Sequence, residues 1–288
     1  MIAAMHQHDP AMNLTEACQA LGVSRSGFHA HRHKPLRQRH AEDAALASAV
    51  RAAFHVGRHA YGSPRIRKEL QRIGLSSGTR RISRLMRQQG LRVRQKRRFV
   101  PRTTITDKTS PIAPNHLLKA PAPQHLNEVW VTDITYLPTA EGWLYLAAEM
   151  DLYSRRIIGW STHDTLATLL PAKALEKALA TRGPNLNNLL HHSDRGCQYS
   201  SAAFRSRLQL SGITQSMSRS GNCYDNAAME SFWATLKTEC FQGPPPTSHS
   251  QANSMLFDYI ETFYNSRRLH SALGYLSPVD FENSIQNN

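Results

Sequence analysis

The second half of the chain opens with three segments whose residues are typical of β-strands. Residues 128–136, EVWVTDITY, alternate between apolar and polar side chains, and the β-rich segments 143–150 and 156–161 follow after short turns. A period of two places successive side chains on opposite faces of a sheet. We therefore predict three consecutive strands here, joined by two turns.

Helical and strand-like patterns then alternate. Apolar positions over 168–180 are spaced for a helix, and the apolar pair Leu189 and Leu190 indicates a short buried strand. The series continues with a helix over 201–210, a strand over 213–217 and a helix from about 226 to 242. Three strands followed by this alternation form the order of the ribonuclease H-like α/β fold, which has a mixed sheet.

Residues 13–33 show the pattern of a helix-turn-helix. Thr15 is the predicted N-cap of the first helix, Gly22 makes the turn, and Ser24 begins the second helix. In such a motif the second helix can enter the major groove of DNA. An ordinary helical hairpin fits these residues about equally well.

Two further helices are predicted next. The first covers 41–56, and its apolar side consists of Ala45, Leu46, Ala49, Val50 and Phe54. The second has Ser63 as its N-cap and Pro64 as its first residue, and Gly74 ends it. The second helix then runs through the apolar residues Ile66, Leu70 and Ile73.

The following helix combines an apolar side with a strongly basic one. It opens at Ser77 or Thr79 and ends at Gly90, and from residue 80 to 102 the chain has ten basic residues and no acidic one. Solvated helix faces usually mix both signs, so we interpret this stretch as a contact surface for DNA or RNA phosphates. The candidate contacts are Arg80, Arg81, Arg84, Arg87, Arg97 and Arg98.

The formal net charge of +14 is unevenly distributed. Residues 1–102 hold 21 Lys and Arg against five Asp and Glu, whereas residues 103–288 hold 14 against 16. We therefore expect the basic N-terminal part of the chain to bind a polyanion and the remaining part to have a different function. Four widely spaced cysteines argue against a disulfide framework or a zinc site. We find no signal peptide and no membrane span, and expect a cytoplasmic protein.

These shifts in composition predict a multidomain chain with an all-α N-terminal region. We expect an N-terminal helical region over 1–58, a basic helix-turn-helix region over 59–100, a proline-rich linker over 101–124, and a catalytic core with a C-terminal helical extension over 125–288.

Three carboxylates are the candidate catalytic residues. Asp133 lies inside an apolar strand, where a charge is costly unless it is paired or bound to a metal. Asp194 follows the Leu189 strand, and Glu230 lies in the first turns of the last helix of the series. In the predicted fold the two strands are neighbours, so the three carboxylates can meet. Such oxygen ligands suit Mg²⁺ or Mn²⁺, and two ions could activate a water or a 3′-hydroxyl.

Other candidates for this site have more ordinary interpretations. Asp151 precedes a turn, Asp225 is a helix cap, and Glu239 lies on another part of the helix. His191 and His192 could bind a metal, but we expect a structural role because they belong to a buried strand.

The sequence around the three carboxylates carries a family resemblance. WVTDITY, HHSDRGCQY and NCYDNAAMES, with 60 and then 35 residues between their acids, resemble the DDE core of retroviral-integrase-like transposases. The segments SRSGFHA, YGSPRIRKEL and YIETFYNSRRLHSALGYLSP resemble the second-frame (OrfB) product of the bacterial insertion-sequence family three. The resemblance thus covers nearly the whole chain.

The resemblance implies a transposase that nicks and joins DNA at the terminal inverted repeats of its own element and transfers them to target DNA. It assigns Asp133, Asp194 and Glu230 to metal-ligand positions, and Lys237, two helical turns after Glu230, to a DNA contact. It further implies an active homodimer or higher oligomer, a nucleoid-associated location in a bacterium, and a first-frame (OrfA) product with which this chain can be fused by frameshifting.

Two other functions fit parts of the pattern. A metal-dependent nuclease would use the same carboxylates without joining strands, and a DNA-binding regulator or degenerate remnant would occupy the element's ends without cutting them. The chain departs from the family at Ser220, where a second basic residue usually follows Arg219. The sequence before the core also shows no zinc-binding HHCC pattern.

Overall fold

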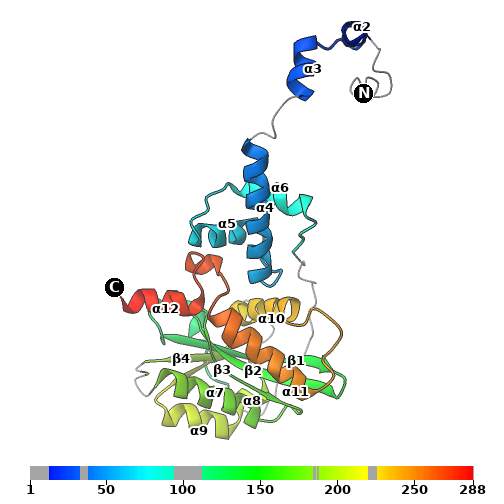
Figure 1. The fold of residues 1–288 in the computed structure, drawn as a ribbon. Coiled ribbons are helices and arrows are strands. Elements are labelled where there is room, and N and C mark those ends of the chain that lie inside the picture. The colour runs from blue at the N-terminus through cyan, green and yellow to red at the C-terminus, as the bar shows by residue number, and fades with distance from the viewer. Residues whose placement is uncertain are drawn as a thin grey trace.

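The computed structural model describes residues 13–32, 38–93, 112–183, 186, 188–219 and 226–287 (Figure 1). A five-stranded sheet forms the centre of its second half. The strands are β1 (Val129–Thr139), β2 (Gly142–Asp151), β3 (Ile157–His163), β4 (Leu190–Ser193) and β5 (Thr214–Met217).

The strand order is β3-β2-β1-β4-β5. β1 and β2 are antiparallel, as are β2 and β3, whereas β4 runs parallel to both β1 and β5. The predicted mixed sheet is therefore confirmed, and β1 and β4 lie side by side as expected. β1 runs three residues past the predicted end, because its hairpin with β2 continues until Thr139 lies opposite Gly142.

Helices cover both faces of this sheet (Figure 1). On one face, Trp130 and Ile158 pack with residues of the helices that follow β3 and β4. On the other, Val131 and Met150 pack with residues of the helices that follow β5. The first face carries α7 (Leu169–Arg182), α8 (Cys197–Ser200) and α9 (Ala202–Leu210), and the second carries α10 (Ala227–Glu239) and α11 (His249–Phe257).

Two local features secure β3. Gly159 allows α7 to approach closely, because a Cβ at this position would lie 2.3 Å from the carbonyl oxygen of Ala174. Asn265 pairs with the backbone of Ile157 at two points, accepting from its N–H and donating to its carbonyl oxygen, both at 2.9 Å. Asn265 ends a π-helix, η3 (Asp258–Asn265), after which the chain forms η4 (Ser271–Leu273) and α12 (Pro278–Gln286).

The N-terminal pair of helices is α2 (Leu14–Ala20) and α3 (Arg25–Arg32). Asn13, not Thr15, is the N-cap of α2, and its Oδ1 accepts from the backbone N–H of Thr15 at 3.0 Å. The prediction for Thr15 was wrong because Asn13, two positions earlier, caps a helix at least as well. Ser24 directly precedes α3, at the predicted start of this helix, and its hydroxyl accepts from the N–H of Gly27.

Three helices follow, α4 (Gln38–Val56), α5 (Ser63–Arg72) and α6 (Thr79–Gln88). The N-cap of α5 differs from the prediction, because Gly62 has the extended backbone that precedes the helix and Ser63 is the first helical residue. α6 begins at Thr79, one of the two predicted starts, and Gly78 is its N-cap. Ala45 is exposed on α4, and Ala53 takes a place in the core instead. α4 packs against both α5 and α6, across the boundary expected at residue 58.

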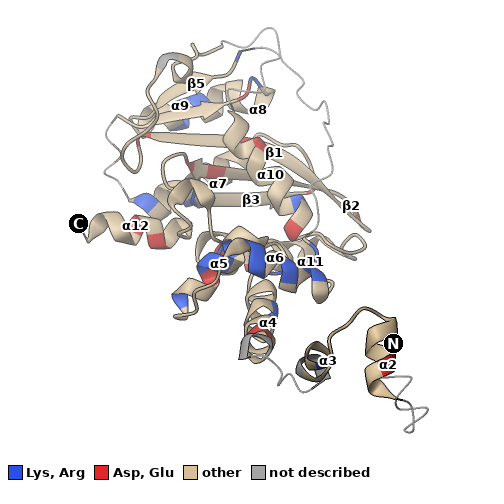
Figure 2. Cartoon of the chain, turned by 90° about the horizontal axis from the view of Figure 1, so that it is seen from above, with Lys and Arg blue, Asp and Glu red and all other residues tan. Residues whose placement is uncertain are grey.

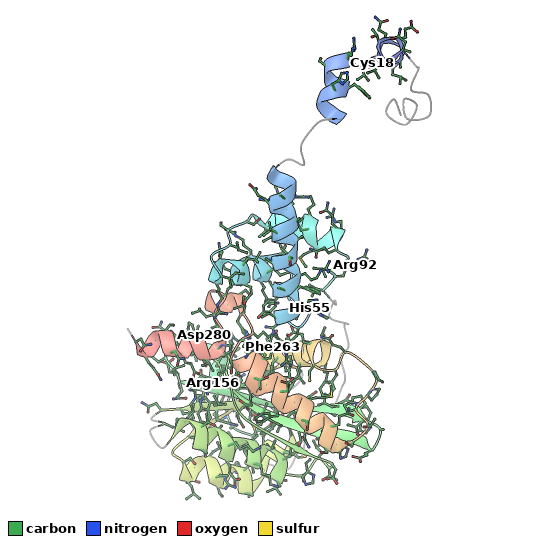
Figure 3. All side chains as sticks on the ribbon, in the orientation of Figure 1. Cys18, His55, Arg92, Arg156, Phe263 and Asp280 are labelled. Carbon is green, nitrogen blue, oxygen red and sulfur yellow. The ribbon has the colours of Figure 1, made fainter. Side chains whose placement is uncertain are left out.

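These three helices share an apolar core with the C-terminal part of the chain. Val50, Ile66 and Ile82 belong to the same buried cluster as Phe263 and Tyr264 of η3. Figure 3 labels Phe263 and Asp280 at this contact, where Arg72 forms an ion pair with Asp280 at 3.0 Å. The hydroxyl of Tyr61 also accepts a hydrogen bond from the N–H of Leu269 at 2.9 Å.

The predicted linker lies partly outside the described residues. Its described portion packs on the core, because the carbonyl oxygen of Pro114 accepts from the N–H of Met217 and the N–H of His116 donates to the hydroxyl of Ser216. A 3₁₀ turn, η1 (Leu117–Lys119), follows. Among the helices that the structure describes, none is long and apolar enough to cross a membrane.

Candidate active site

Two of the three predicted carboxylates lie at the same end of neighbouring parallel strands. β4 pairs with β1 only at residues 129–131, and Asp133 stands two residues further along β1. Asp194 directly follows Ser193, the last residue of β4. Both side chains line one pocket of about 420 Å³. The sequence therefore placed these two acids correctly in the fold.

Asp133 is held by two donors. Its Oδ1 accepts from the backbone N–H of Ile134 at 2.8 Å, and its Oδ2 accepts from the indole Nε1 of Trp233 on α10 at 2.9 Å. Burial of the carboxyl group and the nearby charge of Asp194 raise the pKa of Asp133 to about 7, although both hydrogen bonds act in the opposite direction. Such crowding of carboxylates favours a proton or a cation between them.

Asp194 begins a short loop that its own carboxylate stabilises. Oδ1 accepts from the N–H of Gly196 at 2.9 Å, and the guanidinium of Arg195 donates to the carbonyl oxygen of Ser218, after β5, at 2.7 Å. Arg195 therefore ties the loop to the neighbouring strand end. The carboxylate of Asp194 is positioned by backbone that the sheet itself supports.

Glu230 is on α10, one helical turn before Trp233. Its side chain is exposed, and its partial burial raises its pKa. The charge of Glu230 contributes to the raised pKa of Asp133, so the helix does bring it toward the pair. Within the described part of the chain, however, no three Asp, Glu, His or Cys side chains are close enough to hold a metal ion together.

Lys237 is on the same side of α10 as Glu230 and Trp233, since the three residues are spaced by three and four positions. Its Nζ lies 5.1 Å from the centre of the Tyr136 ring. Burial lowers the pKa of Lys237, and the charge of Asp133 partly offsets this. Lys237 is thus beside Tyr136 and near enough to Asp133 to be affected by its charge, on the side of α10 that carries Trp233.

A layer of buried polar groups supports the acids from the other face of the sheet. The hydroxyls of Thr132 and Tyr199 are 3.2 Å apart, and Nε2 of His191 lies 3.0 Å from the carboxylate of Glu149. Glu149 and His191 are fully buried. Sequence reasoning missed Glu149, although a carboxylate inside an apolar strand was the same signal that identified Asp133.

The residues given structural interpretations behave accordingly. His192 is buried with Nδ1 2.9 Å from the hydroxyl of Ser216. Asp151 is fully buried and accepts from the backbone N–H groups of Asn127, Tyr153 and Ser154. Glu239 forms a buried ion pair with Arg268. Asp225, the predicted cap, lies outside the described residues, and α10 is preceded by Asn226, whose Nδ2 donates to the carbonyl oxygen of Thr132.

The predicted phosphate contacts divide into two groups. Figure 2 shows that Lys and Arg gather over α5 and α6. Asp43 on α4 accepts from Nε of Arg81 and from Nη2 of Arg84, each at 2.6 Å, and these bonds lower its pKa. Arg80 and Arg87 are exposed and have no ion pair with any residue that the structure describes. Arg97 and Arg98 lie outside those residues.

Comparisons with known proteins agree with this geometry. The chain matches the family model of an integrase core domain over residues 123–223, a second integrase core model over 211–278, and an HTH-like domain over 40–99. A 31 kDa protein of insertion element IS600 from Shigella sonnei is 43% identical over 92% of this chain and 96% of its own. Transposase InsF of insertion sequence IS3A from Escherichia coli (strain K12) is 37% identical over 97% of both chains.

Among solved structures, the HTLV-2 integrase catalytic core domain in complex with magnesium is similar, with a TM-score of 0.40 and 14% identity over 54% of this chain and 95% of that one. The mixed sheet and its paired acids define an integrase-type core joined to an HTH-like, DNA-binding region. The chain belongs to the family of insertion-sequence transposases that includes InsF of IS3A. It is a transposase of the polynucleotidyl-transferase type, and its function is DNA transposition and integration.

Proposed function

We propose that Asp133, Asp194 and Glu230 are the catalytic carboxylates and that they act on DNA by holding divalent metal ions. The observation that carries this is the pocket shared by Asp133 and Asp194, in which the pKa of Asp133 is raised to about 7. Two carboxylates that repel each other, with a third on the adjoining helix, form an oxygen donor set that suits Mg²⁺ or Mn²⁺.

The chain's own residues have separate tasks in this proposal. Trp233 fixes the orientation of the Asp133 carboxylate, and the loop at Gly196 fixes that of Asp194. When bound, a pair of ions would lower the pKa of an attacking water or 3′-hydroxyl and stabilise the leaving oxygen. Lys237 supplies a positive charge beside the acids for a DNA phosphate.

Glu230 needs to move closer to the two aspartates to share a metal ion with them. Electrostatic repulsion among the three carboxylates opposes this approach. A cation bound between them would attract each carboxylate and so favour the approach. Glu230 is on the side of α10 that faces Asp133, because Trp233 on the same side donates a hydrogen bond to the Asp133 carboxylate. We therefore propose that metal binding draws Glu230 into the pocket.

The experiment is metal-dependent nicking and joining of DNA that carries the element's ends. Asp194→Asn should lower both activities more than about 100-fold, beyond the loss expected from a mere supporting partner of a metal ligand. Asp164→Asn, which changes an exposed carboxylate outside the pocket, should retain activity. Binding of the same DNA in a gel-shift assay should survive both changes. Full activity of Asp194→Asn would refute the assignment.

The same assay separates transposition from simple hydrolysis. A nuclease with the same carboxylates would release nicked DNA without forming joined products, whereas a transposase joins the 3′-hydroxyl to a target strand. A regulator or degenerate remnant would bind the ends and produce neither.

We further propose that Arg80 and Arg87 contact DNA phosphates, and that Arg97 and Arg98, which lie outside the described residues, do so as well. The partners that fit this proposal are the terminal inverted repeats, the target DNA, a second copy of the chain and a first-frame (OrfA) product to which it can be fused. The corresponding location is the bacterial nucleoid. We also propose that α4, α5 and α6 form one DNA-binding unit.

A further inference from the structure

The pocket that contains the two aspartates has an aromatic side that catalysis by carboxylates does not require. Tyr136, Trp143 and Tyr145 line it together with Asp133 and Asp194. In the β1–β2 hairpin Tyr136 lies opposite Tyr145, and Pro138 lies opposite Trp143. Directly opposed residues project on the same face of a sheet, so the three rings share one face.

Trp143 is the most exposed of these rings. Its side chain is 52% exposed, and it meets the ring of Tyr136 edge to face, with centroids 4.9 Å apart. Covering the exposed indole with a ligand is favourable because the large apolar area of the ring is removed from water. The edge-on contact with Tyr136 holds the indole in place while one of its sides remains open to a ligand.

A cation lies next to one of these rings. Nζ of Lys237 on α10 is 5.1 Å from the centre of the Tyr136 ring, so a positive charge is available beside the aromatic side of the pocket. Single-stranded nucleic acid binds in this way, with its bases on aromatic rings and its phosphates beside positive charges. The volume of about 420 Å³ is within the range of small-ligand pockets.

We propose that Trp143 and Tyr136 form a stacking site for one unpaired nucleobase, next to the phosphodiester that the carboxylates attack. This inference rests on the proposed function, because it places the DNA strand at Asp133 and Asp194. The site accepts any base, since every base has an aromatic face, and it favours a strand end that has left the duplex. It thereby selects frayed or tailed ends over intact duplex.

The test uses the full chain with Asp194→Asn, which leaves the DNA uncut. The probe is a hairpin duplex with a short single-stranded tail, carrying 2-aminopurine as the first unpaired base, whose fluorescence falls when it stacks on an aromatic ring. The comparison is a blunt duplex with 2-aminopurine at its last pair. Binding should quench the tailed probe, and the tailed probe should bind more tightly than the blunt one.

Trp143→Ala and Trp143→Leu should each abolish the extra quenching and reduce the preference for the tailed probe by about tenfold, the usual effect of removing one base–aromatic stack. Trp143→Phe should retain most of both. Phe257→Ala is the matched control, because it removes an exposed aromatic ring, 57% exposed, from α11. Circular dichroism of each variant establishes that it is folded, and the leucine variant keeps an apolar side chain at the position.

Equal quenching in the parent and in both aliphatic variants would overturn the stacking site. So would a change in sedimentation confined to the Trp143 variants, because it would show that a second copy of the chain covers the ring. Either result is distinct from failure of the proposed function, which would appear as an absence of metal-dependent cutting by the unmodified protein.

Discussion

At the scale of single residues, the proposed catalytic residue Asp133 occupies surroundings that are unfavourable for a carboxylate. Its carboxyl group is taken from water, placed beside Asp194 and compensated by only two hydrogen bonds. Groups in such surroundings weaken the fold and are typical of active sites, as the proposal for Asp133 requires. Replacing it should therefore lower activity and raise stability together.

The effect of Asp133→Asn on stability should depend on pH. The pKa of the carboxyl group is about 7 in the folded protein and 3.8 ordinarily. Between these values the folded state binds the proton more tightly than the unfolded state, so the contribution of Asp133 to stability falls as pH rises from about 4 to about 7. In EDTA, Asp133→Asn should raise Tm at pH 8, and the gain should shrink toward pH 4. A gain of the same size at both pH values would contradict this.

The basic residues of α6 should also separate by role. Arg80→Ala with Arg87→Ala should weaken DNA binding and reduce the slope of log K against log salt by about 0.9 for each phosphate that the protein no longer neutralises. Arg81→Ala with Arg84→Ala should instead lower Tm, because both side chains hold Asp43 of α4. Salt titration by fluorescence anisotropy and thermal melting of the two double variants test this. Similar effects in both assays for both variants would argue against the division.

The sequence could predict part of this residue-scale picture. Asp133 was identifiable because a charge inside an alternating strand needs a partner. Trp233 and Lys237 share a side with Glu230 at helical spacing, so Trp233 could have been found by the same reasoning. The bonds of Arg81 and Arg84 to Asp43 could not, since they join residues about 40 positions apart whose contact depends on how α4 and α6 pack.

At the scale of elements, α10 is the part on which the site depends most. Trp233 connects it to Asp133, and near its end Glu239 accepts from Arg268 and from the hydroxyl of Tyr259. The succession of helices and strands along the chain could be predicted from the apolar periodicity, because each element buries one side. The caps and the π-helix did not, because Gly62, Gly78 and η3 depend on local backbone geometry that periodicity does not report.

Glu239→Gln should therefore destabilise the protein and impair the site. The change leaves the guanidinium of Arg268, 6% exposed, without its carboxylate, and loss of one partner of a buried ion pair typically costs about 3–5 kcal/mol. Asp258→Asn is the control, because Asp258 is 58% exposed in its pair with Arg58 and such surface pairs contribute little. Chemical denaturation of both variants tests the contrast. Equal decreases in unfolding free energy would contradict it.

At the scale of the whole molecule, the DNA-binding helices and the catalytic core are joined by more than a linker. Val50, Ile66 and Ile82 share one buried cluster with Phe263 and Tyr264. A continuous core predicts that residues 38–93 and the integrase-type core unfold in a single cooperative transition. A rigid connection would also fix the distance between the proposed DNA contacts on α6 and the pocket of Asp133. DNA bound at α6 would then reach the acids along a defined path.

Tyr61 is the residue on which this connection can be tested with the least disturbance. Its ring is buried, and its hydroxyl accepts from the N–H of Leu269 and donates to the carbonyl oxygen of Arg267. Tyr61→Phe keeps the ring and leaves both backbone groups unpaired, which should cost about 1–3 kcal/mol. The decrease should appear in a single denaturation transition followed both by circular dichroism and by tryptophan fluorescence, since all four tryptophans lie in the integrase-type core. Two separate transitions in the unmodified protein would show that the helices and the core fold independently, and the positioning of DNA would then depend on the linker instead.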